Sequence, residues 1–339
     1  MRPFQRLTSA LLFASFLPAA VLSAATETGP ALAKPTRPPA ITPTAPVGNA
    51  QVASAEDADL WLRAQIALGR NRFSCGPIDG VKGAQTTAAL FAFQESRGLP
   101  RTGELDTETA AALLSEDDRI MELVLTTEDL AGLQPVSATW LGKSQQTALA
   151  YESVLELLAE RTHASTALLQ KLNPEVNWDQ LMPGATLRVP AVALPAVKIN
   201  AAQIRIGLSA RSLQVRDETG QLVAHFPVSI ARDAEKRPEG ELRVAVVVAD
   251  PDYTFDPEVF TESEEARSLG RKLILPPGPN NPVGVAWIGL DRPGYGIHGT
   301  PHPEKVGRTE SHGCFRLANW DARSLLAMAW TGLPVLVEP

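Results

Sequence analysis

The sequence predicts a multidomain chain in which a small three-helix bundle and a βααβ module precede a mainly β domain with a sandwich- or barrel-like sheet. Its 339 residues provide enough material for two or three domains. Apolar side chains recur at helical spacing in the first half of the chain and at strand spacing after residue 200. Because strands dominate the last part, packed β-sheets are favoured there over a Rossmann arrangement.

The first 25 residues have the pattern of an export signal. Residues 1–6 carry positive charge, residues 7–22 are apolar, and Ser23-Ala24-Ala25 supplies the small residues of a cleavage site. The apolar run is shorter than a membrane-spanning helix, and no later stretch approaches the ~20 apolar residues that such a helix needs. We therefore expect a cleaved signal peptide and no stable membrane insertion afterwards; an uncleaved signal would act as an anchor.

The next residues, 26–52, are rich in proline, alanine and threonine and have no apolar period. Such a composition buries too little apolar surface to offset the entropy of ordering, so it predicts an extended linker. The whole chain carries a net charge of −7 and has no basic cluster. This balance argues against nucleic acid as a partner and is typical of a solvated acidic surface.

Residues 53–117 predict a helical domain of three helices. Ser54 and Asp57 form a capping pair for the first helix, the second stops at Gly98, and the third begins at Asp106, a good N-cap. The first helix places four apolar residues on one face: Leu60, Trp61, Ala64 and Leu68.

Residues 118–144 are expected to form a connector, and residues 145–192 have the pattern strand, helix, helix, strand. The first strand is expected from Thr147, and Ser165 is expected to cap the second helix. Pro183-Gly184 then turns into a strand from Thr186 to Val189.

Residues 196–338 predict the β domain. Apolar residues alternate with others around Ile204 and again around Leu213, and the turn at residues 217–220 joins two strands as a hairpin. Val244 to Ala249 is a continuous apolar run, which predicts a strand buried on both faces.

The segment from Asp250 to Val283 is rich in proline and has few periodic apolar residues. A long segment of this kind within a compact domain is usually functional, so we expect it to border a cleft as a lid or binding loop. Tyr253 and Trp287 are candidate aromatic contacts there, although ordinary packing explains Trp287 equally well.

The pattern with the strongest chemical meaning is His298-Gly299-Thr300 followed by Ser311-His312-Gly313-Cys314-Phe315-Arg316. A cysteine attacks as its thiolate, and a thiol with a pKa of ~8.5 needs a proton acceptor or a cation beside it at neutral pH. Both histidines can supply that help. The backbone amides of Gly313 and Cys314, at a glycine turn, are suited to bind the oxyanion that forms during attack on a carbonyl.

Two other interpretations use the same residues. His298, His312 and Cys314 suit zinc, but a structural zinc site wants four ligands and the chain offers no convincing set, so we expect no metal and no other cofactor. Cys75 and Cys314 would form a disulfide in an oxidising compartment, but they lie in different predicted domains; we expect Cys75 to be a small buried side chain. The other histidines are expected outside the site: His163, His225 and His302.

At these residues the sequence resembles the catalytic domain of the L,D-transpeptidases, the YkuD-type family. The signature of that family is His-Gly-Thr followed by Ser-His-Gly-Cys and an apolar-Arg pair, and here Phe315 replaces the commoner isoleucine. The resemblance includes the run from Pro276 to Gly284 and spans roughly residues 196–337. It implies the YkuD fold, which is mainly β, and peptidoglycan stem peptides as substrates.

The two N-terminal modules also resemble known families. Residues 53–117 are similar to the three-helix peptidoglycan-binding domain through Pro77-Ile78-Asp79-Gly80 and Gly98-Leu99-Pro100. Residues 145–192 are similar to the LysM module through Asn173-Pro174 and the stretch from Leu181 to Pro190. The resemblances imply glycan strands as partners, while a module that only stabilises the protein remains an alternative in each case.

Acyl transfer in two steps is the leading hypothesis for the mechanism. Cys314 attacks a stem-peptide carbonyl that follows a diamino acid, and His298 takes up the thiol proton and later returns one to the leaving amine. The Gly299 carbonyl would orient His298, and His312 would add positive character beside the sulfur. Arg316 would receive a substrate carboxylate or, alternatively, form an internal salt bridge. The remaining candidate substrate-binding residues are Ser311, Tyr253 and Trp287.

The resemblance implies that the donor is a tetrapeptide stem that loses its terminal D-alanine, and it leaves the acceptor open. A second stem peptide would give a 3-3 cross-link in cell-wall biogenesis, a lysine would attach an anchored protein, and water would make the protein an L,D-carboxypeptidase. A non-catalytic peptidoglycan-binding protein and a secreted cysteine peptidase are alternatives of other classes. The export signal and the wall-directed modules favour the periplasm, with the cell wall as the alternative location.

Overall fold

The computed structural model of the chain describes residues 55–193, 199–259, 263–309 and 313–339. The predicted signal peptide, the predicted linker and the proposed cap residue Ser54 lie outside these ranges, as do Ser311 and His312. In the described ranges, no helix combines the length and the apolar character that crossing a bilayer requires.

The N-terminal helical module has the three helices that the sequence predicts: α1 (Ala55–Arg70), α2 (Ala84–Arg97) and α3 (Thr107–Leu113). Helix α2 ends at Gly98, which has a left-handed φ of 67° that glycine adopts without strain. Helix α3 begins after Asp106, whose side chain accepts a hydrogen bond of 2.8 Å from the Thr109 amide. Both ends are therefore set by local capping, as predicted from the sequence.

The βααβ module differs from the prediction at its first strand. That strand is β1 (Ile120–Val124), inside the predicted connector, and it pairs antiparallel with β2 (Thr186–Pro190). The prediction of a strand from Thr147 is wrong. The Leu149 amide donates a hydrogen bond to the Pro277 carbonyl, and the Leu149 carbonyl accepts one from the Asn280 amide. The backbone there is thus bonded to the β domain instead of to β2.

Four helices and one 3-10 turn lie between β1 and β2 in the sequence: α4 (Thr127–Ala131), α5 (Trp140–Ser144), α6 (Val154–Arg161), α7 (Thr166–Leu172) and η1 (Trp178–Gln180). Ser165 caps α7 by accepting a hydrogen bond from the Leu168 amide at 3.1 Å, as predicted.

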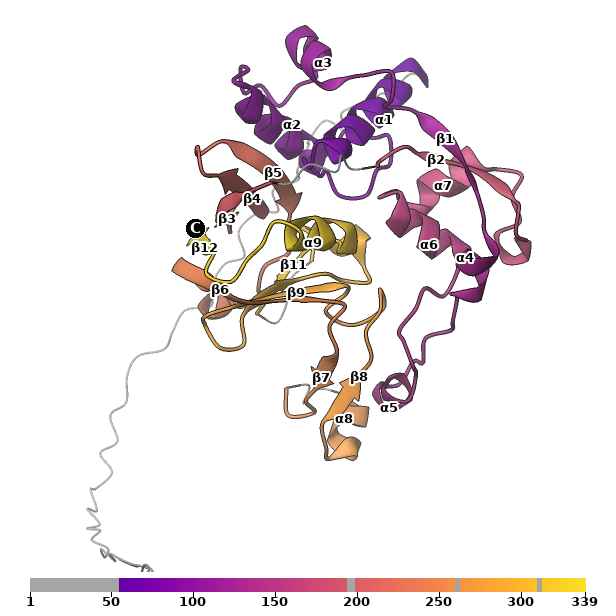
Figure 1. Cartoon of the computed structure of the whole chain (residues 1–339), viewed down its shortest axis with the longest axis vertical. Helices are drawn as coiled ribbons and strands as arrows, with labels where there is room; N and C mark the ends of the chain where they lie inside the picture. The colour runs from indigo at the N-terminus through magenta and orange to yellow at the C-terminus, as the bar shows by residue number, and fades with distance from the viewer. Residues whose placement is uncertain (1–54, 194–198, 260–262, 310–312) are drawn as a thin grey trace, which may run out of the picture. The chain divides into compact units, whose positions relative to one another are not determined.

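The β domain is built on one eight-stranded sheet with the order β11-β10-β9-β6-β12-β3-β4-β5. Its strands are β3 (Ala201–Gly207), β4 (Ser212–Asp217), β5 (Leu222–Pro227), β6 (Gly240–Ala249), β9 (Ala286–Leu290), β10 (Gly296–His298), β11 (Phe315–Arg316) and β12 (Pro334–Glu338). Helix α9 (Asn319–Leu326) contacts β9, β6 and β10 (Figure 1). Two 3-10 turns lie in the connections between strands: η2 (Ala234–Lys236) between β5 and β6, and η3 (Pro303–Lys305) between β10 and β11.

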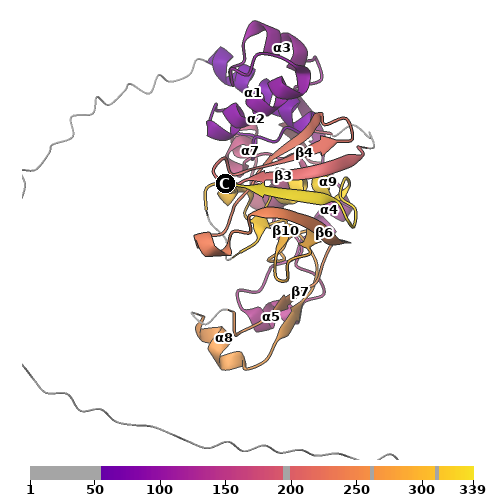
Figure 2. The same ribbon diagram turned by 90° about the vertical axis from the view of Figure 1, so that its left-hand side faces the viewer.

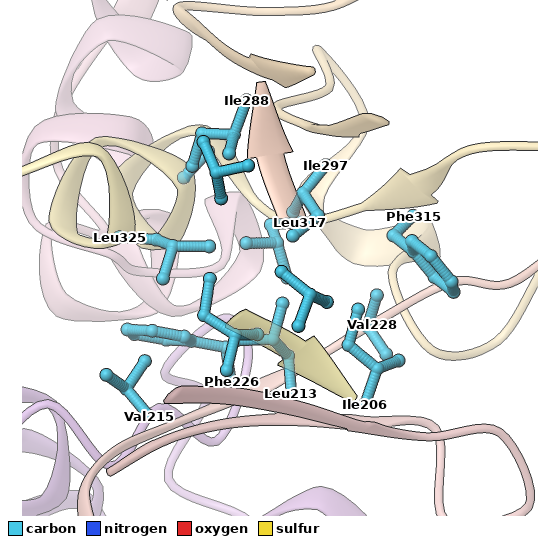
Figure 3. Packing of buried hydrophobic residues seen from close by; sticks show 14 of the residues in the cluster. Ile206, Leu213, Val215, Phe226, Val228, Ile288, Ile297, Phe315, Leu317 and Leu325 are labelled. Carbon is cyan, nitrogen blue, oxygen red and sulfur yellow. The ribbon is translucent and has the colours of Figure 1, made fainter. Parts of the chain in front are cut away.

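This sheet curls until its two ends meet. Ser229 follows β5 at one edge and exchanges two backbone hydrogen bonds, of 2.9 and 3.0 Å, with Arg316 in β11 at the other edge. Apolar side chains from both halves of the sheet and from α9 fill the space that the curl encloses (Figure 3): Ile206, Leu213, Val215, Phe226, Val228, Ile288, Ile297, Phe315, Leu317 and Leu325. The mainly β, barrel-like domain predicted from the sequence is therefore confirmed.

Strand β6 was expected to be buried on both faces, and this expectation is wrong. Val244 is 1% exposed, whereas Val246 and Val248 are 44% and 36% exposed. Leu242, Val244 and Val247 pack on the core, and a register shift between Val244 and Val246 turns Val246 and Val248 to the other face, so only one face of β6 is covered. A continuous apolar run does not reveal how many faces of a strand are covered.

The proline-rich segment from residue 250 to 283 carries more regular structure than expected. Strands β7 (Tyr253–Phe255) and β8 (Leu273–Leu275) pair antiparallel, and α8 (Glu264–Leu269) lies between them in sequence. We call residues 253–275 the arm. Figures 1 and 2 both show α5 beside this arm.

The helical module attaches to the β domain at the edge of the sheet. The His225 amide of β5 donates to the Arg72 carbonyl at 2.9 Å, and the Ser74 amide donates to the His225 carbonyl at 2.8 Å. The residues after α1 thus add a short parallel pairing to the edge strand, which satisfies backbone groups that an edge otherwise leaves unpaired. The domain boundaries predicted from the sequence remain predictions.

Candidate active site

Three neighbouring strands set the candidate site. In the sheet register, Trp287 of β9 lies opposite His298 of β10, and His298 lies beside Arg316 of β11. Side chains in one row across a sheet share a face, so these three groups are on the same side. Cys314 directly precedes β11, two residues before Arg316.

These side chains line one cavity of about 460 Å³. Its wall includes six of the residues predicted for the site: Tyr253, Trp287, His298, Gly313, Cys314 and Arg316. It also includes residues that the sequence did not single out: Trp140, Val259, Pro282, Val283 and Gly294. The expectation that the segment from residue 250 to 283 borders the cleft agrees with this wall.

The imidazole of His298 is held in one orientation and one tautomer. Its Nδ1 lies 2.6 Å from the Gly299 carbonyl oxygen, and because a carbonyl only accepts, Nδ1 carries the proton and Nε2 keeps a free lone pair. Burial lowers the pKa of His298 to about 4, and the positive charge of Arg316 acts in the same direction, while the Gly299 hydrogen bond opposes them. The ring is therefore neutral near pH 7 and able to accept a proton.

The indole of Trp287 packs on His298, with ring centroids 5.7 Å apart and planes 25° apart. Two glycines make room for it. A Cβ at Gly296 would lie 2.6 Å from the indole, and a Cβ at Gly289 would lie 3.0 Å from its Nε1. The small residues opposite each other in β9 and β10 thus allow the indole to lie over the strands beside the imidazole.

The thiol of Cys314 is half-buried, and its Sγ donates to the Gly294 carbonyl at 3.6 Å. Burial raises the pKa of Cys314, while a backbone hydrogen bond at Gly296 and the charge of Arg316 oppose that effect. The described surroundings thus favour a resting pair of neutral thiol and neutral imidazole. Such a pair forms a thiolate when the proton moves to the imidazole during attack.

The guanidinium of Arg316 is half-buried at the cavity wall. Burial lowers its pKa, and Cys314 and Tyr253 act in the opposite direction. Among the carboxylates within the described ranges, none forms an ion pair with Arg316. The predicted internal salt bridge is therefore not seen in this part of the chain, and the cation lies where a substrate anion could reach it.

No disulfide joins the two cysteines. Cys75 is buried in the apolar core of the helical module, as expected for a small packed side chain, and burial raises its pKa. The zinc alternative depends on His312, which is outside the described residues. Three histidines are not among the residues of the cavity wall: His302 is exposed, His163 is half-buried and His225 is buried.

Asn319, the first residue of α9, supports the site from behind and was missed by the sequence analysis. Its Nδ2 donates to the Pro279 carbonyl and to Glu160 of α6, both at 3.0 Å, and its Oδ1 accepts from the Val285 amide at 3.3 Å. A Cβ at Gly299 would lie only 2.2 Å from that oxygen. Asn319 thus packs closely against Gly299, whose carbonyl orients His298.

Comparison with known proteins agrees with this chemistry. Residues 201–337 match the family model of the L,D-transpeptidase catalytic domain, called YkuD, and residues 58–113 match a putative peptidoglycan binding domain. The chain therefore carries a catalytic domain of the L,D-transpeptidase family and, ahead of it, a domain of the peptidoglycan-binding family.

Several curated relatives share the catalytic region. A putative L,D-transpeptidase YkuD of Bacillus licheniformis is 25% identical over 185 residues, which is 55% of this chain and 93% of that protein. A putative L,D-transpeptidase YqjB of Bacillus subtilis is 32% identical over 117 residues, 33% of this chain and 57% of that protein. Among solved structures, an L,D-transpeptidase from Mycobacterium smegmatis is 17% identical, with a TM-score of 0.33, and covers 47% of this chain and 76% of its own.

Proposed function

We propose that this protein is an exported L,D-transpeptidase that forms a thioester between Cys314 and a peptidoglycan tetrapeptide stem and passes the stem to an amine. The observation that carries the proposal is the meeting of Cys314 and His298 at one cavity, with the imidazole held by Gly299 so that Nε2 is a proton acceptor. A histidine base next to a cysteine is the arrangement that activates a thiol for attack on a carbonyl.

In the first step, Sγ of Cys314 attacks the carbonyl carbon of the bond that follows the diamino acid. The thiol proton passes to Nε2 of His298, and the negative charge on the carbonyl oxygen is bound by the amides of Gly313 and Cys314. When the C–N bond breaks, His298 returns the proton to the leaving amine of D-alanine. The acyl group is then held on sulfur as a thioester.

In the second step, the acceptor amine attacks the thioester carbon and loses a proton to His298, and the thiol of Cys314 is regenerated. His312 would add positive character beside the sulfur, and Arg316, with Ser311, Tyr253 and Trp287, would hold the donor peptide. The carboxylate of the substrate is the natural partner of the Arg316 guanidinium. No step of this sequence uses a metal or another cofactor.

The resting protonation states determine where binding energy is needed. The pKa of Cys314 is raised and that of His298 is lowered, so proton transfer from sulfur to nitrogen is unfavourable without substrate. Interactions that appear only when charge develops on the carbonyl oxygen must offset this cost. The thioester chemistry is therefore expected to depend on the oxyanion donors as well as on the histidine.

The two N-terminal modules are proposed to bind glycan strands and to keep the catalytic domain on the wall. The match of residues 58–113 to a peptidoglycan-binding family supports this role for the helical module. For the βααβ module, LysM-like binding rests on its sequence pattern. Both modules act outside the cytoplasm in this proposal, in the periplasm or at the cell wall, in the remodelling that determines cell shape.

The central test uses purified mature protein and defined tetrapeptide muropeptides, analysed by mass spectrometry. Wild type is expected to release D-alanine and to carry the acyl group on Cys314, whereas Cys314→Ala does neither. Cys75→Ala is the matched control, because this second cysteine is buried away from the cavity, and it should retain activity. Conversion of tetrapeptide by Cys314→Ala would refute the assignment of the nucleophile, whereas binding of tetrapeptide by wild type without any conversion would favour a peptidoglycan-binding protein without this chemistry.

The same assay separates the acceptors. A second stem peptide as acceptor gives a 3-3 cross-linked dimer, and a lysine-containing peptide gives an isopeptide-linked adduct. If only the tripeptide appears with either amine present, water is the acceptor and the protein is an L,D-carboxypeptidase. Hydrolysis of an unrelated protein substrate would instead support a cysteine peptidase.

A further inference from the structure

One aromatic wall of the candidate active-site cavity comes from outside the catalytic domain. Trp140 belongs to α5, in the stretch that the sequence predicted to be only a connector, and it lines the same cavity as Cys314, His298 and Arg316. The family model begins at residue 201, so this residue is not part of the matched catalytic domain.

Trp140 is held by the arm of the β domain. Its ring stacks on Phe255 of β7, with centroids 4.3 Å apart and planes 17° apart. Around this pair lies a separate apolar cluster that combines residues of the arm with residues from the stretch around α5: Val136, Leu149, Tyr253, Ala266, Leu269, Leu273 and Leu275.

Hydrogen bonds of backbone groups that follow Trp140 hold α5 and attach the chain to the β domain. The Leu141 amide donates to the carboxylate of Glu265 in α8 at 3.0 Å, and the Gly142 amide donates to Thr139 Oγ1 at 3.0 Å. Further along, Leu149 is bonded to the residues around Gly278 through its amide and its carbonyl. The indole is thus positioned on a rigid support, which is what a binding surface needs in order to gain affinity.

The charges near this wall suit an anionic peptide. The ammonium of Lys143 lies 5.1 Å from the centroid of the Trp140 ring, and Arg316 lines the cavity. Both cations contribute to lowering the pKa of His302, after burial and Lys305, so their fields overlap at the same loop. A cavity wall that combines the indole of Trp140 with the guanidinium of Arg316 fits a peptide with aliphatic side chains and free carboxylates.

We propose that Trp140 is a substrate-contacting residue of the catalytic cavity and that its indole packs on the aliphatic part of the acyl-donor peptide beside the attacked carbonyl. This inference rests on the proposed function of the cavity and extends it, because part of the donor site is supplied by α5, which lies between β1 and β2 of the βααβ module in the chain. Trp140 holds the peptide and takes no part in proton transfer.

Steady-state kinetics on the full mature chain test the proposal. Trp140→Leu, which keeps an apolar group on Phe255, is expected to raise KM for the tetrapeptide about ten-fold with kcat changed less than two-fold, corresponding to about 1.4 kcal/mol. Trp140→Phe, which retains a ring, should recover most of the affinity. Trp330→Phe is the matched control, since Trp330 is half exposed and donates to Ala201 at the start of β3.

Binding is measured separately from chemistry on the Cys314→Ala background. Calorimetry with the tetrapeptide should give a Kd about ten-fold higher when Trp140→Leu is added. A tetrapeptide with a diazirine on its diamino acid should label the tryptic fragment 120–143, which contains Trp140, and this measurement requires no change at residue 140. Label confined to other fragments would refute the contact even if Trp140→Leu failed to fold.

The outcomes separate this inference from the function on which it rests. If wild type converts the tetrapeptide and Trp140→Leu shows the same KM and Kd, Trp140 does not contact the donor peptide, and the proposed function is unaffected. If wild type converts nothing but the Cys314→Ala protein binds the tetrapeptide with the expected dependence on Trp140, the proposed chemistry fails and the contact stands.

Discussion

At the scale of single residues, the candidate site depends on the space that glycines leave by having no side chain. Trp287 lies on His298 because Gly296 and Gly289 provide no side chains beneath the indole. The orientation of the base is thus set twice, by the Gly299 carbonyl on Nδ1 and by the stacked ring. The signature residues could be found by their chemistry, whereas these glycines acquire meaning only in the folded sheet.

Gly296→Ala is expected to reduce tetrapeptide turnover at least ten-fold. The new Cβ would lie 2.6 Å from the Trp287 indole, so the indole must move away from His298. The overpacking should also lower stability by about 1–3 kcal/mol. Thermal unfolding and kcat/KM are the measurements. Gly207→Ala in β3 is the control, because its nearest neighbour would be 3.5 Å from the new Cβ; equal effects in both variants would contradict the role of the indole.

At the scale of elements, the accuracy of sequence-based prediction follows the range of the interactions. Capping is local, so Gly98, Asp106 and Ser165 marked helix ends correctly. The alternation around Ile204 identified β3 for the same reason. Strand β1 was missed because its partner β2 lies more than sixty residues away, and a mostly apolar run of only five residues does not by itself distinguish a strand from a helix.

Long sequence separation also explains why the sequence did not reveal two residues of the site. Asn319 acts through Pro279, Val285 and Glu160, and Trp140 acts through Phe255, and none of these pairs is close in sequence. The catalytic residues of the motif around Cys314 lie close together in sequence and could therefore be recognised. The groups that support it come from two modules, the βααβ module and the catalytic domain, so only the folded chain brings them together.

The first turn of α9 should therefore control the site as an element. Asn319→Ala removes the amide that ties Pro279, Val285 and Glu160 together, and leaves buried polar groups without their partner, at a cost of about 1–3 kcal/mol. Turnover is expected to fall with it, because Gly299 loses its support. Chemical unfolding and D-alanine release are measured together. Asn177→Ala, at an exposed turn of the βααβ module, should change neither; if the two variants behave alike, α9 does not support the site.

At the scale of the whole molecule, buried carboxyl groups lie where the modules meet the catalytic domain. Ser74, which follows α1, donates to Asp321 of α9 at 2.9 Å, and Glu160 of α6 accepts from Asn319. Burial raises the pKa of Asp321 to about 8 and that of Glu160 to about 7, in each case against weaker opposing hydrogen bonds. The modules are thus joined to the catalytic domain through groups that prefer to be protonated.

This preference makes the stability of the assembled chain dependent on pH. Between the ordinary pKa of Asp321, 3.8, and its folded value near 8, the folded protein holds a proton that the unfolded chain has released. Stability is therefore greatest at the acidic end of this window, decreases as the pH rises and is lowest above about 8. Glu160 acts with the same sign at lower pH.

Asp321→Asn isolates the contribution of one of these groups, because the amide is neutral at every pH and its oxygen can still accept from Ser74. The melting temperature of the variant relative to wild type should rise by about 5 °C or more between pH 5 and pH 9, given ~1.4 kcal/mol per pKa unit and ~2–4 °C per kcal/mol. Asp252→Asn, at an exposed carboxyl, controls for the change in net charge and should follow wild type at both values. Because Glu160 is present in all three proteins, its effect cancels in the comparison. Parallel melting curves for wild type and Asp321→Asn from pH 5 to 9 would show that Asp321 is ionised in the folded protein and that its contact with Ser74 tolerates the charge.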